Sequence, residues 1–241
     1  MKHLLFATTA LALSATGVLA QDVVRMGTEG AYPPYNYIDD ATGEVAGFDI
    51  DVGNELCKRA ELNCEWVATD WDSIIPNLVS GNYDTIMAGM SITPERDVVI
   101  DFTQNYLLPE PSAFVGLSDD VEIDGAVIAA QTGTIQAAHV TEIGATLVEF
   151  PTPDDTISAI KNGEADALLA DKSFLAPFVN EDPDLYFVGD DVMLGDGLGI
   201  GLRESDGDLK AKLNAAIESM KADGSLNTMI VKWFGESSPT F

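Results

Sequence analysis

The stretch Thr85-Ile86-Met87-Ala88-Gly89-Met90-Ser91-Ile92-Thr93-Pro94-Glu95-Arg96 runs from a strand through a loop into a helix. Residues 85–88 form a short apolar run that predicts a buried strand. Thr93 followed by Pro94 is typical of a helix start, with threonine as the N-cap and proline at the first helical position. Arg96 therefore lies in the first turn of a helix that closely follows the end of a strand.

Strand–loop–helix units of this kind alternate along the chain. We expect strands at 23–26, 64–69, 85–88, 126–130, 147–150, 167–170 and 200–202, and helices at 48–60, 73–79, 134–142, 153–161 and 172–179, with two more helices closing the chain. This alternation predicts an α/β fold with largely parallel sheets covered on both faces. Parallel sheets of this kind bind ligands beyond the carboxyl ends of their strands. The candidate binding loops are those after Met26, Thr69, Ala88, Ala130 and Ala170.

The first twenty residues have the pattern of a secretory signal peptide. Residues 1–3 are Met-Lys-His, residues 4–19 are apolar or small, and residues 18–20 place small side chains where a signal peptidase cleaves. The mature chain is expected to begin near Gln21, to reside in the periplasm and to carry no lipid, because the first cysteine is Cys57. We expect no transmembrane helix, since no later segment reaches about 18 apolar residues.

Length and charge narrow the function classes. About 220 residues remain after the signal peptide, enough for one large domain or two smaller lobes. The formal net charge is −28, which argues against binding to nucleic acid or to anionic membranes. We read this charge as a property of the surface, and we expect a monomer that needs no cofactor.

The cysteines predict a disulfide. Cys57 and Cys64 are the only two in the chain, and export places them in an oxidising compartment. A zinc site is not expected, because the mature chain holds one histidine, His139, and no second cysteine pair.

Two helix starts can bind one anion. The guanidinium of Arg96 is a rigid fork of donors that matches a carboxylate, although a first-turn arginine is also typical of an exposed helix surface. Gly133, Thr134 and Ile135 form a second helix start after a strand, and its free backbone N–H groups are further donors. We expect the two starts to grip the same carboxylate.

Other strand-end loops carry an acceptor and aromatic side chains. Asp171 follows the apolar run 167–170 and either accepts from an ammonium group or caps the next helix. Tyr32 and Trp71 either flank a ligand side chain or pack in the core. Glu29 either pairs with the cationic tail of a ligand or is solvated. Together these groups match a zwitterionic α-amino acid with a long or cationic side chain, whose buried charges all require partners.

The mature chain resembles the periplasmic polar amino-acid-binding proteins of ABC importers, of the lysine/arginine/ornithine and histidine type. Six blocks carry the resemblance: 27–35 (GTEGAYPPY), 47–51 (GFDID), 71–76 (WDSIIP), 91–96 (SITPER), 133–134 (GT) and 222–225 (ADGS). It implies a two-lobed type II periplasmic-binding-protein fold, in which two α/β lobes are joined by two crossing strands. It also implies a disulfide between Cys57 and Cys64, a free amino acid as ligand and a membrane ABC permease as partner. It places lobe 1 at 22–109 and 194–241, lobe 2 at 113–190, and the hinge at 110–112 and 191–193.

The resemblance also assigns roles in the site. Arg96 and the backbone N–H groups of Ser91 and Ile135 would bind the α-carboxylate. Asp171, the Ser91 hydroxyl and the Gly89 carbonyl would take the α-ammonium. The ligand side chain would lie between Tyr32 and Trp71, with Glu29 at its distal end.

This sequence departs from the family pattern at four of these positions. Ala88 and Gly89 stand where serines are common, Ile135 replaces the second threonine of a Gly-Thr-Thr turn, and Glu29 replaces a more usual aspartate. The expected ligand is a basic amino acid. An opine or a polar neutral amino acid is the alternative, and a cyclohexadienyl dehydratase-type enzyme or a sensor module on the same fold are others.

Overall fold

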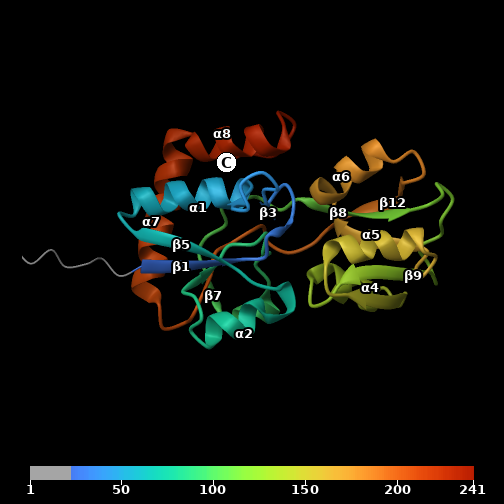
Figure 1. Cartoon of the computed structure of the whole chain (residues 1–241), viewed down its shortest axis with the longest axis horizontal. Helices are drawn as coiled ribbons and strands as arrows, with labels where there is room; N and C mark the ends of the chain where they lie inside the picture. The colour runs from blue at the N-terminus through green and yellow to red at the C-terminus, as the bar shows by residue number, and fades with distance from the viewer. Residues whose placement is uncertain (1–22) are drawn as a thin grey trace, which may run out of the picture.

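The computed structural model describes residues 23–241, so the predicted signal peptide at 1–20 lies outside the described residues. Two α/β lobes lie side by side along the long axis of the molecule (Figure 1). In the described part of the chain no helix is long and apolar enough to cross a membrane. The predicted two-lobed α/β architecture is confirmed.

The first lobe is built on a five-stranded sheet of order β5-β1-β6-β13-β7. Its strands are β1 (Val23–Thr28), β5 (Asn63–Ala68), β6 (Thr85–Ile86), β7 (Asp101–Phe102) and β13 (Gly201–Leu202). β1 runs parallel to β5 and β6, whereas β13 pairs antiparallel with both β6 and β7. The helices of this lobe are α1 (Phe48–Arg59), α2 (Ile74–Val79), α7 (Gly207–Asp223) and α8 (Ser225–Phe234), with the short η1 (Trp71–Ser73) and α3 (Pro94–Asp97).

The second lobe has a sheet of order β10-β9-β11-β8-β12. Its strands are β8 (Pro111–Gly116), β9 (Val127–Gln131), β10 (Thr146–Phe150), β11 (Ala167–Asp171) and β12 (Tyr186–Met193). β10, β9 and β11 are parallel, and β8 is antiparallel to both β11 and β12. Helices α4 (Ile135–Glu142), α5 (Pro153–Lys161) and α6 (Lys172–Glu181) connect them. The expectation of largely parallel sheets therefore holds for three strands of each sheet, and the sequence patterns missed β7, β8 and β12.

The chain crosses between the two sheets twice, once between β7 and β8 and once between β12 and β13. At the start of β8, Pro111 and Ser112 pair antiparallel with Met193 and Val192 at the end of β12. A small sheet of β2 (Ala31–Tyr32), β3 (Asn36–Ile38) and β4 (Val45–Ala46) stands next to α1 in the first lobe. The predicted lobe limits and hinge remain predictions.

Each lobe has its own apolar core. The first is centred on α1, α7 and α8 packed on β1, with fully buried side chains such as Phe48, Leu56 and Ile217. The second is centred on β8, β9 and β11 with α5 and α6, and it buries Phe174 and Leu168. Figure 1 shows α1 and α8 on one side of the first sheet and α2 on the other.

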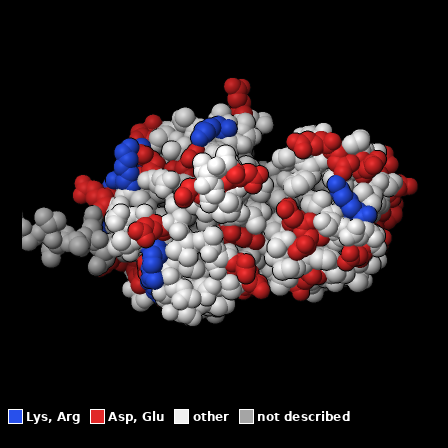
Figure 2. Space-filling view, viewed as in Figure 1, with Lys and Arg blue, Asp and Glu red and all other residues white. Residues whose placement is uncertain are grey.

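The predicted disulfide is present. Cys57 near the end of α1 is bonded to Cys64 on β5, with an S–S distance of 1.99 Å. The bond ties the first crossover helix to the strand that follows it. On the surface, acidic side chains are spread over both lobes and outnumber the basic ones on the face drawn in Figure 2.

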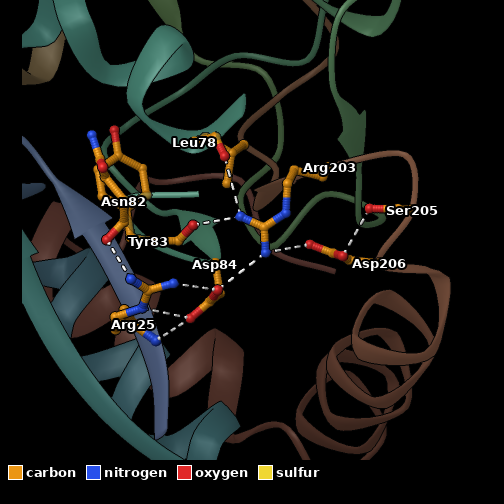
Figure 3. Close-up of polar contacts among 8 residues, drawn as sticks. All are labelled: Arg25, Leu78, Asn82, Tyr83, Asp84, Arg203, Ser205 and Asp206. Carbon is orange, nitrogen blue, oxygen red and sulfur yellow. Dashed lines mark hydrogen bonds and ion pairs between the residues drawn. The ribbon is translucent and has the colours of Figure 1, made fainter. Parts of the chain in front are cut away.

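A charged cluster in the first lobe joins three separate segments: β1, the residues just before β6 and the residues just after β13 (Figure 3). The Asp84 carboxylate accepts from the backbone N–H, Nε and Nη2 of Arg25 on β1, at 2.9–3.0 Å, and from Nη2 of Arg203 at 3.0 Å. Arg203 also donates to the Tyr83 carbonyl at 2.6 Å and pairs with Asp206 at 2.7 Å. Burial alone would raise the pKa of Asp84, but the hydrogen bonds from Arg25 and Arg203 lower it below its ordinary value.

We expect Asp84→Asn to destabilise the protein by about 1–3 kcal/mol, because two guanidinium groups lose their shared carboxylate. Urea unfolding followed by circular dichroism measures the change. Lys161→Met is the control, since it breaks the exposed 2.6 Å ion pair with Asp182 and should cost only about 0–1 kcal/mol. Equal losses in the two variants would contradict a special role for the cluster.

Candidate functional site

A cavity lies between the two lobes, at the carboxyl ends of the parallel strands of both sheets. Every predicted site residue lines it: Glu29, Tyr32, Trp71, Ala88, Gly89, Ser91, Arg96, Thr134, Ile135 and Asp171. Strand-end loops far apart in the sequence therefore converge on one space.

Six further residues line the cavity and were missed by the sequence reasoning. They are Gln131, Gln136, Pro153, Thr156, Leu169 and Ala170, all from the second lobe. Gln131 is the last residue of β9 and Gln136 lies in the first turn of α4, on either side of the predicted turn. Their positions at a strand end and at a helix start were the available signal.

Arg96 is held in the cavity wall by its own lobe. Thr93 caps α3 as predicted, its Oγ1 accepting from the Arg96 backbone N–H at 3.2 Å. The Arg96 Nη1 donates to the Ser91 carbonyl at 2.9 Å, and the guanidinium lies 5.4 Å from the centre of the Trp71 ring. Burial lowers the pKa of Arg96 to about 10, so the side chain stays cationic at neutral pH.

Asp171 is the acceptor that faces this region from the second lobe. Its carboxylate accepts from the Tyr32 hydroxyl at 3.0 Å, the Gln136 Nε2 at 2.9 Å and the Ser112 hydroxyl at 3.3 Å. Asp171 stands at the N-cap position of α6 but makes no side-chain capping bond, so the carboxylate is not used for a simple cap. Burial raises the pKa of Asp171 to about 6, and the hydrogen bond from Tyr32 opposes this shift.

The Tyr32 ring packs in the core, as one of its two sequence alternatives predicted, and it also faces the cavity. It packs against the cores of both lobes, stacked 4.5 Å from Phe174 and 5.5 Å from Tyr35, and it also lines the cavity. Trp71 behaves likewise, since it is a buried member of an apolar cluster in the first lobe and it supports Arg96.

The backbone of the loop after β6 is fixed by a buried carboxylate. Asp49 accepts from the Gly89 backbone N–H at 2.7 Å, the Tyr106 hydroxyl at 2.8 Å and the Asn36 amide at 3.0 Å. Gly89 has a φ of 60°, a left-handed conformation that favours glycine. The conformation of the Ala88–Ser91 loop is thus set from beneath by the first lobe.

The start of α4 faces the cavity from the other side. Thr134 caps this helix, its Oγ1 accepting from the Ala137 backbone N–H at 3.1 Å, and Ile135 is the first helical residue. The first backbone N–H groups of a helix have no partner within the helix. The Arg96 Nη2 reaches the Gly133 carbonyl at 3.4 Å, so the two predicted helix starts do meet.

Glu29 lies at another part of the cavity wall, directly after β1. Its Oε1 accepts from the Gln131 Nε2 of the second lobe at 2.6 Å. Burial raises the pKa of Glu29 to about 7, with the Gln131 hydrogen bond opposing the shift and the charge of Asp70 adding to it.

The charges of the cavity are not paired with one another. Among the described residues none of Glu29, Arg96 and Asp171 takes part in an ion pair. Residues 23–241 also contain no group of His, Cys, Asp and Glu placed to hold a metal ion. The arrangement offers one cationic and two acidic side chains to a small polar molecule.

A two-lobed α/β protein with a polar cavity between its lobes is the architecture of an extracellular solute-binding protein. The family of bacterial extracellular solute-binding proteins, family 3, matches residues 24–236, and the chain belongs to it.

Similar proteins cover the chain almost end to end. The "Putative ABC transporter arginine-binding protein 2" of Escherichia coli is 33% identical, covering 97% of this chain and 99% of that protein. The "L-arginine-binding protein" of Pseudomonas aeruginosa is 34% identical over 93% of this chain and 94% of its own. A crystal structure of a periplasmic His/Glu/Gln/Arg/opine family-binding protein from Silicibacter pomeroyi in complex with lysine is 66% identical, with a TM-score of 0.88, and covers 90% of this chain and 100% of that one.

We expect Glu29→Gln to stabilise the ligand-free protein above pH 7 by roughly 1–3 kcal/mol. The pKa of Glu29 is raised from 4.5 to about 7 in the folded state, so its ionisation favours unfolding. The destabilisation is absent below about pH 4.5 and grows as the pH rises to 7. Thermal unfolding between pH 4 and pH 8.5 should therefore show the variant diverging upward from wild type. Glu95→Gln, at an exposed glutamate, is the control and should run parallel to wild type.

Proposed function

We propose that this chain is the substrate-binding component of an amino-acid ABC importer and captures a free basic amino acid by closure of its two lobes. One observation carries the proposal: Arg96 and Asp171 line one cavity from different lobes and form no ion pair within the described chain. A buried charge without a partner is costly. A zwitterion held between them would supply a carboxylate to Arg96 and an ammonium to Asp171.

The surrounding groups suit the two ends of such a ligand. The α-carboxylate would lie on the Arg96 guanidinium and the backbone N–H groups of Ser91 and Ile135, where the start of α4 adds a favourable dipole. The α-ammonium would donate to Asp171, the Ser91 hydroxyl and the Gly89 carbonyl. The fixed conformation of the Gly89 loop preorganises this half of the site.

Glu29 favours a ligand with a cationic tail. It is a second carboxylate in the cavity, and its nearest hydrogen-bond donor is the neutral amide of Gln131. A lysine ammonium or an arginine guanidinium at this position would stabilise the ionised form of Glu29. The net charge of −28, spread over both lobes, would also attract cationic amino acids to the cleft (Figure 2).

The relatives support this choice. Proteins named for binding arginine, or lysine, arginine and ornithine, are 32–34% identical to the chain, and the 66% identical structure holds lysine. The name of that lysine-bound protein also includes glutamine and opines, so an opine or a polar neutral amino acid is the second class of ligand to test.

Closure would turn on the two strands that pass between the lobes. We place the hinge at 110–112 and 191–193, where β8 and β12 pair at their lobe-1 ends, with lobe 1 at 22–109 and 194–241 and lobe 2 at 113–190. The ligand would bind lobe 1 first, and contacts from lobe 2 would then favour the closed state. The closed monomer would deliver the amino acid to a membrane permease from the periplasm, in keeping with the N-terminal signal pattern.

We expect Arg96→Ala to weaken binding of every α-amino acid by roughly 100-fold or more, because the ligand carboxylate loses its charged partner. Calorimetry of the wild type against lysine, arginine, glutamine, glutamate and an opine tests the function itself, and basic amino acids should bind tightest. Asp97→Asn, at an exposed residue of the same helix, should leave the affinities unchanged. Near-normal affinity of the Arg96 variant would contradict the assigned site, and preferential binding of glutamate would contradict the role of Glu29.

The alternative, an enzymatic function, would depend on Glu29, whose pKa of about 7 would let it exchange a proton at neutral pH. An ancestral amino acid-binding protein described as a precursor of cyclohexadienyl dehydratase is 29% identical and has a TM-score of 0.78. We expect no turnover when the protein is incubated with prephenate or arogenate, because the residues that line the cavity in the described structure include no histidine, cysteine or lysine to act with Glu29 and Asp171. Product detected by chromatography, and lost in Glu29→Gln, would reverse this expectation.

A further inference from the structure

Gln131 contributes a polar group to the cavity that no sequence pattern identified. It ends β9 in the second lobe, whereas Glu29 follows β1 in the first. The Gln131 Nε2 donates to the Glu29 Oε1 at 2.6 Å and to the Pro151 carbonyl at 3.2 Å. The glutamine is only 8% exposed, so its amide is fixed by partners on both sides.

These two hydrogen bonds determine which atoms of the Gln131 amide remain free to bind a ligand. A primary amide has two N–H donors and one carbonyl acceptor, and both donors are directed to oxygen atoms. The Gln131 Oε1 has no hydrogen-bond partner among the described residues, and the same holds for the Glu29 Oε2. Neither oxygen is among the fully buried side-chain atoms that lack a hydrogen-bond partner in the described structure. Both side chains line the cavity. Two oxygen acceptors, one charged and one dipolar, therefore belong to hydrogen-bonded residues that line the same cavity and have no other partner in the described structure.

We propose that Gln131 is a specificity-determining residue that forms, with Glu29, a pair of acceptors for the cationic end of an amino-acid side chain. The proposal rests on the function proposed above and deepens it. A lysine ammonium has three N–H donors and an arginine guanidinium has five, so one carboxylate oxygen cannot satisfy either group. A buried donor left without an acceptor costs free energy, and the carbonyl of Gln131 removes part of that cost. An aliphatic tail would leave both oxygens unsatisfied.

The placement of the pair on two lobes gives this selection a second consequence. Glu29 alone belongs to the lobe that we expect the ligand to meet first. Gln131 reaches the tail only when the second lobe has closed, so a cationic tail adds to closure and a neutral tail does not. Closure of the second lobe would then select the ligand side chain in the same step in which it binds the α-amino and α-carboxylate groups.

A purely structural role for Gln131 makes a different prediction. If the amide only tied Glu29 to Pro151, its loss would weaken all ligands alike. An acceptor for the tail affects only ligands whose tail carries donors. Lysine and norleucine separate the two cases, because norleucine has a similar aliphatic tail without the terminal ammonium.

The test compares the wild type, Gln131→Leu and Gln131→Glu by calorimetry at pH 8, with norleucine measured by competition against lysine. Within each variant the ratio of the two affinities cancels any general loss of stability or closure. Gln131→Leu should reduce the preference for lysine over norleucine roughly 10-fold or more. Gln131→Glu has the same shape, loses the two N–H donors, keeps acceptor oxygens and adds a negative charge, so it should retain or increase the preference for lysine.

If the wild type binds lysine and Gln131→Leu leaves the ratio of the lysine and norleucine affinities unchanged, this inference is overturned and the proposed function still stands. An equal loss in Gln131→Glu would also overturn it, because the donors of the amide would then be the groups that matter. A wild type that binds neither ligand, nor any other amino acid, would overturn the proposed function and this inference with it.

Discussion

Placing Arg96 and Asp171 in one cavity without an ion pair costs free energy that the described chain does not recover by itself. The protein lowers part of the cost by orienting neutral dipoles toward each charge. The Ser91 and Gly133 carbonyls face the guanidinium, and hydroxyl and amide donors such as that of Tyr32 face the carboxylate. Neutral dipoles cannot supply an opposite charge. A zwitterionic ligand would supply one to each group, a carboxylate to Arg96 and an ammonium to Asp171. The Thr93 cap and the buried Asp49 carboxylate beneath the Gly89 loop fix the backbone on the Arg96 side of the cavity.

The sequence predicted the fold well where local signals were strong. Thr93 before Pro94 is an N-cap in the structure, as expected, because capping depends on a few neighbouring residues. The helix start predicted at 133–135 is also present, with Thr134 as its N-cap. The local strand patterns did not predict β8 and β12 as members of the second sheet, although the resemblance implied two crossing strands with a hinge at 110–112 and 191–193. Which strand pairs with which is decided by contacts between residues as distant as Pro111 and Met193, and a local pattern does not contain that information.

The same difference applies to the cavity. Residues that follow a strand and open a helix, such as Arg96 and Asp171, were identified because the carboxyl edge of a parallel sheet concentrates such loops. Gln131 and Gln136 were missed because the direction of their side chains depends on strand register and on the rotation of α4. Glutamine is also common on protein surfaces, so its identity alone carries little signal. The resemblance to a family did not identify them either, since it was read from the conspicuous turns.

The groups of the cavity are divided between the lobes in a way that makes closure part of recognition. The first lobe holds Arg96 and Glu29, which in the proposed site would serve the two ends of a basic amino acid. The second lobe holds Asp171 and Gln131, which would serve the same two ends. Asp171 is hydrogen-bonded to Tyr32 of the first lobe, and Gln131 to Glu29. Neither lobe alone offers partners to all the charges of such a ligand. A molecule that satisfies both lobes gains its contacts only in the closed state, and it shifts the population of conformations by that difference in affinity. In the proposed mechanism, the charges that have no ion-pair partner within the described chain would therefore couple ligand binding to closure.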